Sequence, residues 1–173
     1  MSENVAPRSW LTICVGSVKD FCAVAYRLQF EMPGAVVRML RGKNMADSRG
    51  LFNEFAAALQ FPCYFGNNWN AFDECVADLE WMPGNGYLLL IVDGGHVLRD
   101  EPQDRATFFR IMRSVGKEWA EQRGLRFQTI VQCSDDEVET LRHVWEEPLD
   151  SVIRVSELKS FMNAAQPSPG PQS

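Results

Sequence analysis

The sequence predicts an α/β fold in which a small three-stranded parallel sheet packs against about three helices. Residues 87–92 form a continuous apolar run, which is typical of a strand covered on both faces. Residues 48–59 and 107–121 place apolar side chains at helical spacing, so each segment presents one buried stripe. Across residues 35–133 the patterns alternate in the order β, α, α, β, α, β, which indicates a parallel sheet.

The chain ahead of this unit, residues 1–34, is predicted to be an N-terminal extension. It contains two apolar segments, 10–15 and 24–30, that are interpreted as short strands. The Pro-Gly pair at 33–34 then breaks regular structure. A central domain is therefore expected over residues 35–133.

The central domain is expected to open with a strand and a helix. Residues 35–40 contain neighbouring β-branched side chains and are predicted to form the strand. Asp47 or Ser48 can cap the helix that follows, and Phe61 and Pro62 end it. The apolar stripe of this helix comprises Leu51, Phe52, Phe55, Ala58 and Leu59.

A second helix is predicted to begin near Asn68, after a loop over residues 63–67. In the loop, Gly66 permits a backbone turn that a side chain would oppose, and Asn67 or Asn68 can cap the helix. At about 100° per residue, one side of the helix is expected to face the core and comprises Trp69, Phe72, Cys75, Val76 and Leu79. The other side is expected to face solvent and comprises Asn70, Asp73, Glu74, Ala77, Asp78 and Trp81.

The remaining elements complete the pattern. Glycines at 94–95 end the apolar strand, and Gly124 takes the C′ position after the third helix. Residues 127–131 are predicted to form the last strand of the central domain. Residues 134–165 are predicted to be a C-terminal helical extension. Residues 166–173 contain three prolines and are predicted to be disordered.

Acidic residues are unevenly distributed along the chain. The whole chain has a net charge of -6, and residues 73–104 alone carry -7, because Arg99 is the one base among eight acids. An acidic surface repels the nucleic-acid backbone and attracts basic proteins. Direct nucleic-acid binding is therefore disfavoured and a basic protein partner is favoured. The alternative is that the acidic run is only a solvated face.

No metal, cofactor or catalytic site is expected. The five cysteines are odd in number and lack CxxC spacing, and only two histidines accompany them, so reduced thiols are favoured over a zinc site. Asp93 and His96 follow the apolar strand, where α/β proteins place ligands, but a polar turn is the favoured interpretation. The sequence therefore predicts a protein that is not an enzyme.

The sequence also bears on location. No apolar run approaches the roughly 18–20 residues that cross a bilayer. Residues 1–8 are polar and lead into no apolar signal-peptide region. We therefore expect a cytoplasmic protein.

The solvent side of the second helix suggests how the protein could act. Asp73, Glu74 and Asp78 place carboxylates within about two turns, and a carboxylate matches the hydrogen-bonding fork of an arginine guanidinium. Because a ribonuclease active site gathers cations to hold phosphate, carboxylates docked there could exclude the substrate. Acids near a helix start also stabilise the helix electrostatically, and that alone could explain Asp73 and Glu74.

Residues 61–81, FPCYFGNNWNAFDECVADLEW, resemble the signature of the barstar family, the inhibitors of barnase-type ribonucleases. The signature joins a proline, an aromatic pair and a glycine to a capped helix that carries alanine and cysteine. The matching residues are Pro62, Tyr64, Phe65, Gly66, Asn68, Trp69, Ala71 and Cys75. The resemblance extends over about residues 35–133. It implies a small α/β domain that plugs the active site of a basic, bacterial-type ribonuclease.

The resemblance also assigns residues by position. Tyr64 is the loop aromatic, Asn70 and Asp73 are helix contacts, and Glu74 is the central acid. Asn70 stands where the best-known member has an acid, Asp73 where it has tryptophan, and Glu74 is a longer carboxylate. The family pattern also implies an acid on the later helix, and the corresponding position in this chain lies near Ser114. The predicted partner-binding set comprises Tyr64, Gly66, Asn67, Asn70, Asp73, Glu74 and Asp78.

Two functional hypotheses follow. The favoured one is an intracellular inhibitor or immunity protein that binds and blocks a basic ribonuclease without cofactor or turnover. The alternative is a barstar-like interaction or regulatory module with a non-nuclease partner, in which the segments outside residues 35–133 form an additional interface. The departures from the family pattern would fit a different target nuclease, because specificity is a difference between affinities.

Overall fold

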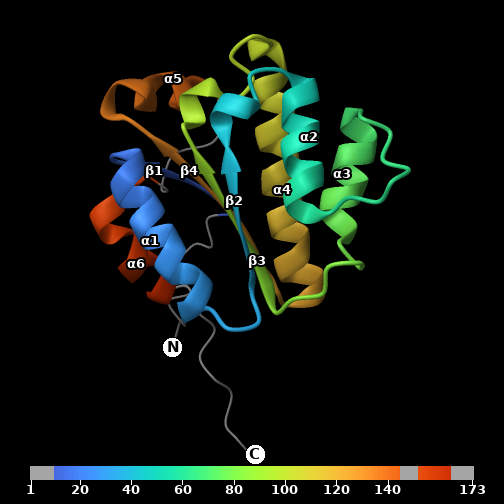
Figure 1. Cartoon of the computed structure of the whole chain (residues 1–173), viewed down its shortest axis with the longest axis horizontal. Coiled ribbons are helices and arrows are strands. Elements are labelled where there is room, and N and C mark those ends of the chain that lie inside the picture. Colours follow the sequence, from blue (N-terminus) through green and yellow to red (C-terminus); the bar gives the residue numbers. More distant parts are fainter. Residues whose placement is uncertain (1–9, 145–151, 165–173) are drawn as a thin grey trace, which may run out of the picture.

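The computed structural model describes residues 10–144 and 152–164 (Figure 1). Their core is one parallel sheet of five strands in the order β2-β3-β4-β1-β5. The strands are β1 (Leu11–Val15), β2 (Val36–Arg41), β3 (Gly86–Val92), β4 (Arg126–Cys133) and β5 (Val152–Arg154). The tail predicted to be disordered, residues 166–173, lies outside the described residues.

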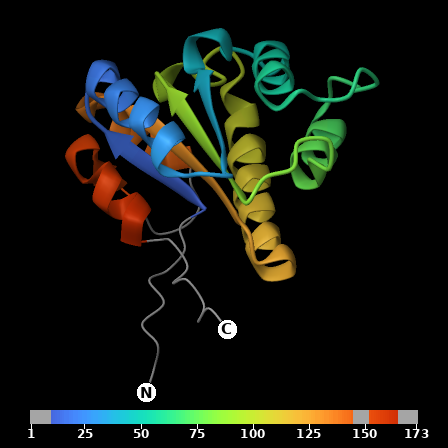
Figure 2. The same cartoon turned by 60° about the horizontal axis from the view of Figure 1, so that its bottom comes forward.

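Helices cover both faces of the sheet (Figure 2). On one face lie α1 (Val18–Glu31) and α6 (Val155–Ala164), and on the other lie α2 (Ser48–Leu59), α3 (Trp69–Asp78) and α4 (Arg105–Arg123). The short α5 (Val138–Val144) adds Leu141 to the core under α2–α4. Every residue of β3 is buried, because β3 has strands on both sides and helices on both faces. The predicted α/β class with a parallel sheet is confirmed.

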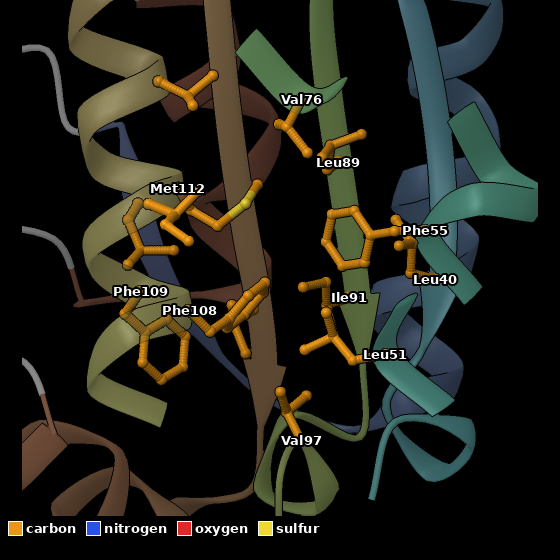
Figure 3. Close-up of a cluster of buried hydrophobic side chains, with 14 of the residues drawn as sticks. Leu40, Leu51, Phe55, Val76, Leu89, Ile91, Val97, Phe108, Phe109 and Met112 are labelled. Carbon is orange, nitrogen blue, oxygen red and sulfur yellow. The ribbon is translucent and has the colours of Figure 1, made fainter. Parts of the chain in front are cut away.

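The core under α2, α3 and α4 is rich in aromatic side chains (Figure 3). Phe55 of α2 lies 5.7 Å from Phe108 of α4 and 5.0 Å from Phe72 of α3, measured between ring centroids. These rings pack against the aliphatic residues of β3, including Leu89 and Ile91. Burying each large apolar side chain contributes roughly 1.5–3 kcal/mol, so Phe72 anchors α3 firmly to the domain.

Several predicted helix boundaries are confirmed. Asp47 caps α2 by accepting a hydrogen bond from the Gly50 backbone at 2.7 Å. Gly124 ends α4 with a left-handed φ of 62°, the conformation expected of a C′ glycine. Within the described residues, no helix is long and apolar enough to cross a membrane.

The interpretation of residues 24–30 as a strand was wrong, because they lie inside α1. Phe21, Ala25 and Leu28 are buried at spacings of four and three, which follow the helical period. Ser17 caps the helix by accepting a hydrogen bond from the Asp20 backbone at 3.1 Å.

The sheet is also wider than the predicted three strands. β1 pairs in parallel with β4, beginning at Leu11 and Thr129, and β5 pairs with the other side of β1. The predicted C-terminal helical extension therefore contains a strand as well as helices. The additional pairing covers the edge of β4, which would otherwise present unpaired backbone groups to solvent.

Candidate functional site

The α2–α3 loop, residues 60–68, carries the most exposed large aromatic side chain of the described residues. Tyr64 is 81% exposed. Its neighbour Phe65 points back to the domain, with its ring centroid 5.0 Å from that of Phe61 and 5.9 Å from that of Phe52. A hydrogen bond of 2.9 Å from the Phe65 backbone to Pro62 closes the turn between them. The loop is thus anchored by one aromatic residue, while the Tyr64 side chain is exposed to solvent.

The bend in this loop lies at Asn67. Asn67 has a left-handed φ of 49°, whereas Gly66 does not adopt a positive φ. Asparagine tolerates this region better than most residues. Gly66 is constrained instead by the Asn68 side chain, which donates to its carbonyl at 3.1 Å and would lie 3.0 Å from a Cβ at Gly66. The expected need for glycine at position 66 therefore comes from a close approach and not from its φ angle.

The start of α3 agrees with the sequence prediction. The Asn68 side chain accepts a hydrogen bond from the Ala71 backbone at 3.0 Å and caps the helix. The predicted core side comprises Phe72, Cys75, Val76 and Leu79, which are buried, and Trp69, which is half-buried. The Trp69 ring packs 5.0 Å from Phe52, so the first turn of α3 is held against α2.

The end of α3 is held by a residue that sequence reasoning did not identify. Arg123, at the end of α4, donates to the Asp78 carbonyl at 3.0 Å and to the Ala77 carbonyl at 3.1 Å. Its guanidinium also lies 3.9 Å from the centroid of the Trp119 ring. These bonds satisfy carbonyl groups left without partners at the helix end. The contact spans 45 residues of sequence, so no local pattern could reveal it.

The prediction that Trp81 lies on the exposed helix face was wrong. Leu79 has a left-handed φ of 48° and ends α3, so the helical projection no longer applies two residues later. The Trp81 indole donates to the Leu59 carbonyl at 2.9 Å, and its ring lies 6.3 Å from Phe61. Trp81 therefore joins α3 to the end of α2.

Three polar residues at intervals of four form a stripe on the outer side of α3. We call Asn70, Glu74 and Asp78 the α3 stripe, and all three are exposed. Their side chains form no ion pair or hydrogen bond with any described residue. At 1.5 Å rise per residue, neighbouring members are about 6 Å apart along the helix axis. The stripe presents two carboxylates and one amide to solvent.

Asp73 is placed differently from the α3 stripe. It is half-buried between α3 and α4. Burial raises the pKa of the Asp73 carboxyl, the positive charge of Arg110 on α4 opposes that rise, and the negative charges of Glu118 and Glu74 add to it. Ser114, where a further acid was expected, is exposed on α4 one turn after Arg110. The acidic surface therefore has a cation at its α4 boundary.

The turn after β3 is held by hydrogen bonds and an ion pair that involve Asp93. Lys43 pairs with Asp93 at 3.5 Å, and the Asp93 backbone donates to the Gln132 side chain at 2.8 Å. The His96 backbone donates to the Asp93 carbonyl at 3.0 Å, while Nδ1 of His96 is buried without a partner. Among the described residues, no group of three or more His, Cys, Asp or Glu side chains could hold a metal ion.

The cysteines are free thiols, as predicted. Cys14, Cys75 and Cys133 are buried, whereas Cys63 is exposed in the α2–α3 loop. Burial raises the pKa of the Cys14 and Cys133 thiols to about 12, so both remain protonated near neutral pH. A protonated thiol is a poor nucleophile, and these two side chains act as small apolar core residues.

Comparison with known proteins tests the resemblance found at residues 61–81. The family model described as barstar, the barnase inhibitor, matches residues 35–132. None of the curated proteins compared with the chain matches it. The matched segment contains β2, β3, all of β4 except its last residue, the helices α2, α3 and α4, and the α2–α3 loop. Because this match covers more than half of the chain, the protein belongs to the barstar family, whose members are inhibitors and not enzymes.

Proposed function

We propose that the protein binds a basic, barnase-type ribonuclease and blocks its active site with the α2–α3 loop and α3. The observation that carries this proposal is the α3 stripe, in which Glu74 and Asp78 are exposed and form no pair with a described residue. The α2–α3 loop, which carries the exposed Tyr64, projects from the domain beside α3 (Figure 2). The acidic α3 stripe and the exposed aromatic side chain are complementary to a cationic cleft with apolar or ring surfaces.

The physical basis is the replacement of substrate phosphates by carboxylates. A cleft that binds RNA gathers Arg, Lys and His, and these donors match the acceptor oxygens of Glu74 and Asp78. Opposite charges also accelerate encounter, with the largest effect at low salt.

Each predicted residue has a place in this proposal. Glu74 is central and contacts the cations of the cleft, Asp78 extends the contact by one turn, and Asn70 supplies a hydrogen-bonding amide. Tyr64 covers an apolar or ring surface of the nuclease. Gly66 and Asn67 set the loop path, and Asp73 contributes at the α4 boundary, where it is only half-exposed.

An immunity protein of this kind works inside the cell that makes the nuclease, in a stoichiometric complex that needs no cofactor. The buried, protonated thiols Cys14 and Cys133 are compatible with the reducing cytoplasm.

A titration against a panel of small basic barnase-type ribonucleases tests the proposal. We expect at least one member to bind and lose activity, and Glu74→Gln to raise the Kd by at least about tenfold. Glu139→Gln, an exposed position on α5, is the matched control and should leave the Kd unchanged. Failure of the wild-type protein to bind any member, or equal Kd values for wild type and Glu74→Gln, would contradict the proposed role of α3.

The departures at Asn70 and Asp73 support the alternative of a barstar-like module with a non-nuclease partner. Asn70 removes an acid expected from the family pattern, and Asp73 adds one beside Arg110, so the charges of this surface are arranged differently. Affinity capture with the wild-type protein and with Glu74→Gln separates the alternatives. Capture of a non-nuclease partner that depends on Glu74, together with no inhibition of any ribonuclease, would favour the module.

A further inference from the structure

We propose that Arg49 is a specificity residue, and that the pocket beside it receives a carboxylate side chain from the nuclease. The inference rests on the proposed function and adds a second contact region next to the α3 stripe. It concerns an Asp or Glu of the partner, in contrast to the partner cations that Glu74 and Asp78 would meet. The complementary surface of the nuclease is thus mixed in charge.

The pocket lies between the first turns of α2 and the α2–α3 loop. It has a volume of about 450 Å³ and is lined by Ser48, Arg49, Phe52, Asn53 and Asn67. Arg49, Asn53 and Asn67 are exposed, whereas Phe52 is almost completely buried and contributes an apolar wall. The lining therefore combines one cation and two amides around an aromatic ring.

The hydrogen-bonding capacity of this lining is largely unused. No described residue accepts a hydrogen bond from the Arg49 guanidinium or pairs with the Asn53 side chain. The Asn67 amide makes one long hydrogen bond of 3.4 Å, to the Phe65 carbonyl. A guanidinium fork flanked by amide donors matches a carboxylate, which offers two acceptor oxygens.

Two acidic residues at the start of α2 accept hydrogen bonds from backbone groups. Asp47 accepts from the Gly50 backbone at 2.7 Å, and Glu101 accepts from the Ser48 backbone at 2.7 Å. Both carboxylates therefore complete the first turn of α2 and are not paired with Arg49. Within residues 10–144 and 152–164, the Arg49 guanidinium thus has no carboxylate partner.

The position of the pocket couples it to the proposed binding surface. Asn67 lines the pocket and also lies one residue before the N-cap of α3. Phe52, the apolar wall, packs 5.0 Å from Trp69 in the first turn of α3. A nuclease that covers the α2–α3 loop would therefore come close to Arg49.

Charge then decides which nucleases are accepted. A basic nuclease that presents a Lys or Arg at this point would place like charges together, which disfavours the complex. A nuclease with a carboxylate there gains a charge-assisted pair. Arg49 would thus discriminate among partners that the α3 stripe alone attracts equally well.

The test measures Kd values for the ribonuclease panel with wild type, Glu74→Gln, Arg49→Gln and Arg27→Gln. Arg27 is an exposed arginine on α1, on the opposite face of the sheet, so its variant removes the same charge far from the pocket. For a bound nuclease, we expect Arg49→Gln to raise the Kd about tenfold or more and Arg27→Gln to leave it unchanged. Replacing the facing Asp or Glu of that nuclease by its amide should abolish the difference between wild type and Arg49→Gln.

The outcomes separate this inference from the proposed function. If Glu74→Gln weakens binding and Arg49→Gln has no effect or tightens it, the carboxylate pocket is overturned while the inhibitor proposal stands. If no acidic residue of the nuclease couples to Arg49, the pocket is likewise overturned. If wild type binds no ribonuclease, both proposals fall together.

Discussion

Arg123 donates a hydrogen bond of 3.0 Å to the backbone carbonyl of Asp78, and this contact ties the end of α4 to the end of the acidic helix. The same guanidinium reaches the Ala77 carbonyl and lies over the Trp119 ring. Asp78 is the last residue of the α3 stripe. The position of one proposed binding carboxylate thus depends on a cation 45 residues further along the chain.

Replacing Arg123 should loosen α3 without unfolding the domain. Arg123→Ala removes two exposed hydrogen bonds and the stacking contact, so we expect a loss of about 1 kcal/mol in the free energy of unfolding. Hydrogen exchange should accelerate in the last turn of α3, and urea denaturation measures the stability. Lys117→Ala, at an exposed position on the same helix, is the control. Unchanged exchange in α3 would show that the Phe72 anchor alone fixes the helix.

Replacing Asp73 should change how stability depends on pH. Burial raises the pKa of the folded Asp73 carboxyl above its ordinary value, so the folded state holds this proton more tightly than the unfolded state. The protein therefore loses stability at this site as pH rises from below the ordinary pKa through the raised one. Asp73→Asn should unfold at a higher temperature than wild type at pH 7, and the advantage should shrink at acidic pH. A pH-independent difference between the two melting temperatures would contradict this account.

Replacing Asn68 should test the start of α3. Asn68→Ala removes the cap on Ala71 and the hydrogen bond to the Gly66 carbonyl, so we expect a loss of about 1 kcal/mol. Asn68→Asp keeps an acceptor for the Ala71 backbone and should lose less. Urea denaturation of the three proteins provides the comparison. If both variants lose the same free energy of unfolding, the main contribution of Asn68 is its hydrogen bond to the Gly66 carbonyl and not the helix cap.

The two adjacent loop aromatics should separate binding from stability. Tyr64 is 81% exposed, so Tyr64→Ala should change the free energy of unfolding by less than about 0.5 kcal/mol. The same variant should weaken nuclease binding, because an exposed aromatic is a common anchor at interfaces. Phe65→Ala should instead lower stability, since Phe65 packs on Phe52 and Phe61. Thermal unfolding measures the stability of both variants, and titration calorimetry measures their binding. A large loss of stability in Tyr64→Ala, or none in Phe65→Ala, would contradict this assignment.

The elements predicted correctly are those whose signal is local. The 87–92 run, the Asp47 cap and the buried side of α3 each follow from residues close together in sequence. The strand prediction for residues 24–30 was wrong because it rested on their apolar and aromatic residues. The spacing of the buried residues Phe21, Ala25 and Leu28 is instead helical. Tyr26 and Phe30 are exposed and pack ring against ring at 5.2 Å, four residues apart, which is a helical arrangement.

The features that escaped prediction depend on distant contacts. The addition of β1 and β5 to the sheet depends on pairing with segments far along the chain. The role of Arg123, the inward position of Trp81 and the half-burial of Asp73 depend on how α3 packs against its neighbours. The exposed α3 stripe, in contrast, was predictable from helical periodicity. Because Phe72 and Val76 are buried, residues on the opposite side of the same helix must face solvent.

The pairing of β1 with β4 determines when the sheet can form during synthesis of the chain. Leu11 meets Thr129 across the sheet, so β1 lacks this partner until the long segment between β1 and β4 has been synthesised. A nascent chain that stops before β4 leaves the apolar strand β1 without a place in the sheet, and a fragment limited to residues 35–132 leaves one side of β4 bare. Assembly of the sheet is therefore a late event, and fragments that omit β1 carry a risk of self-association.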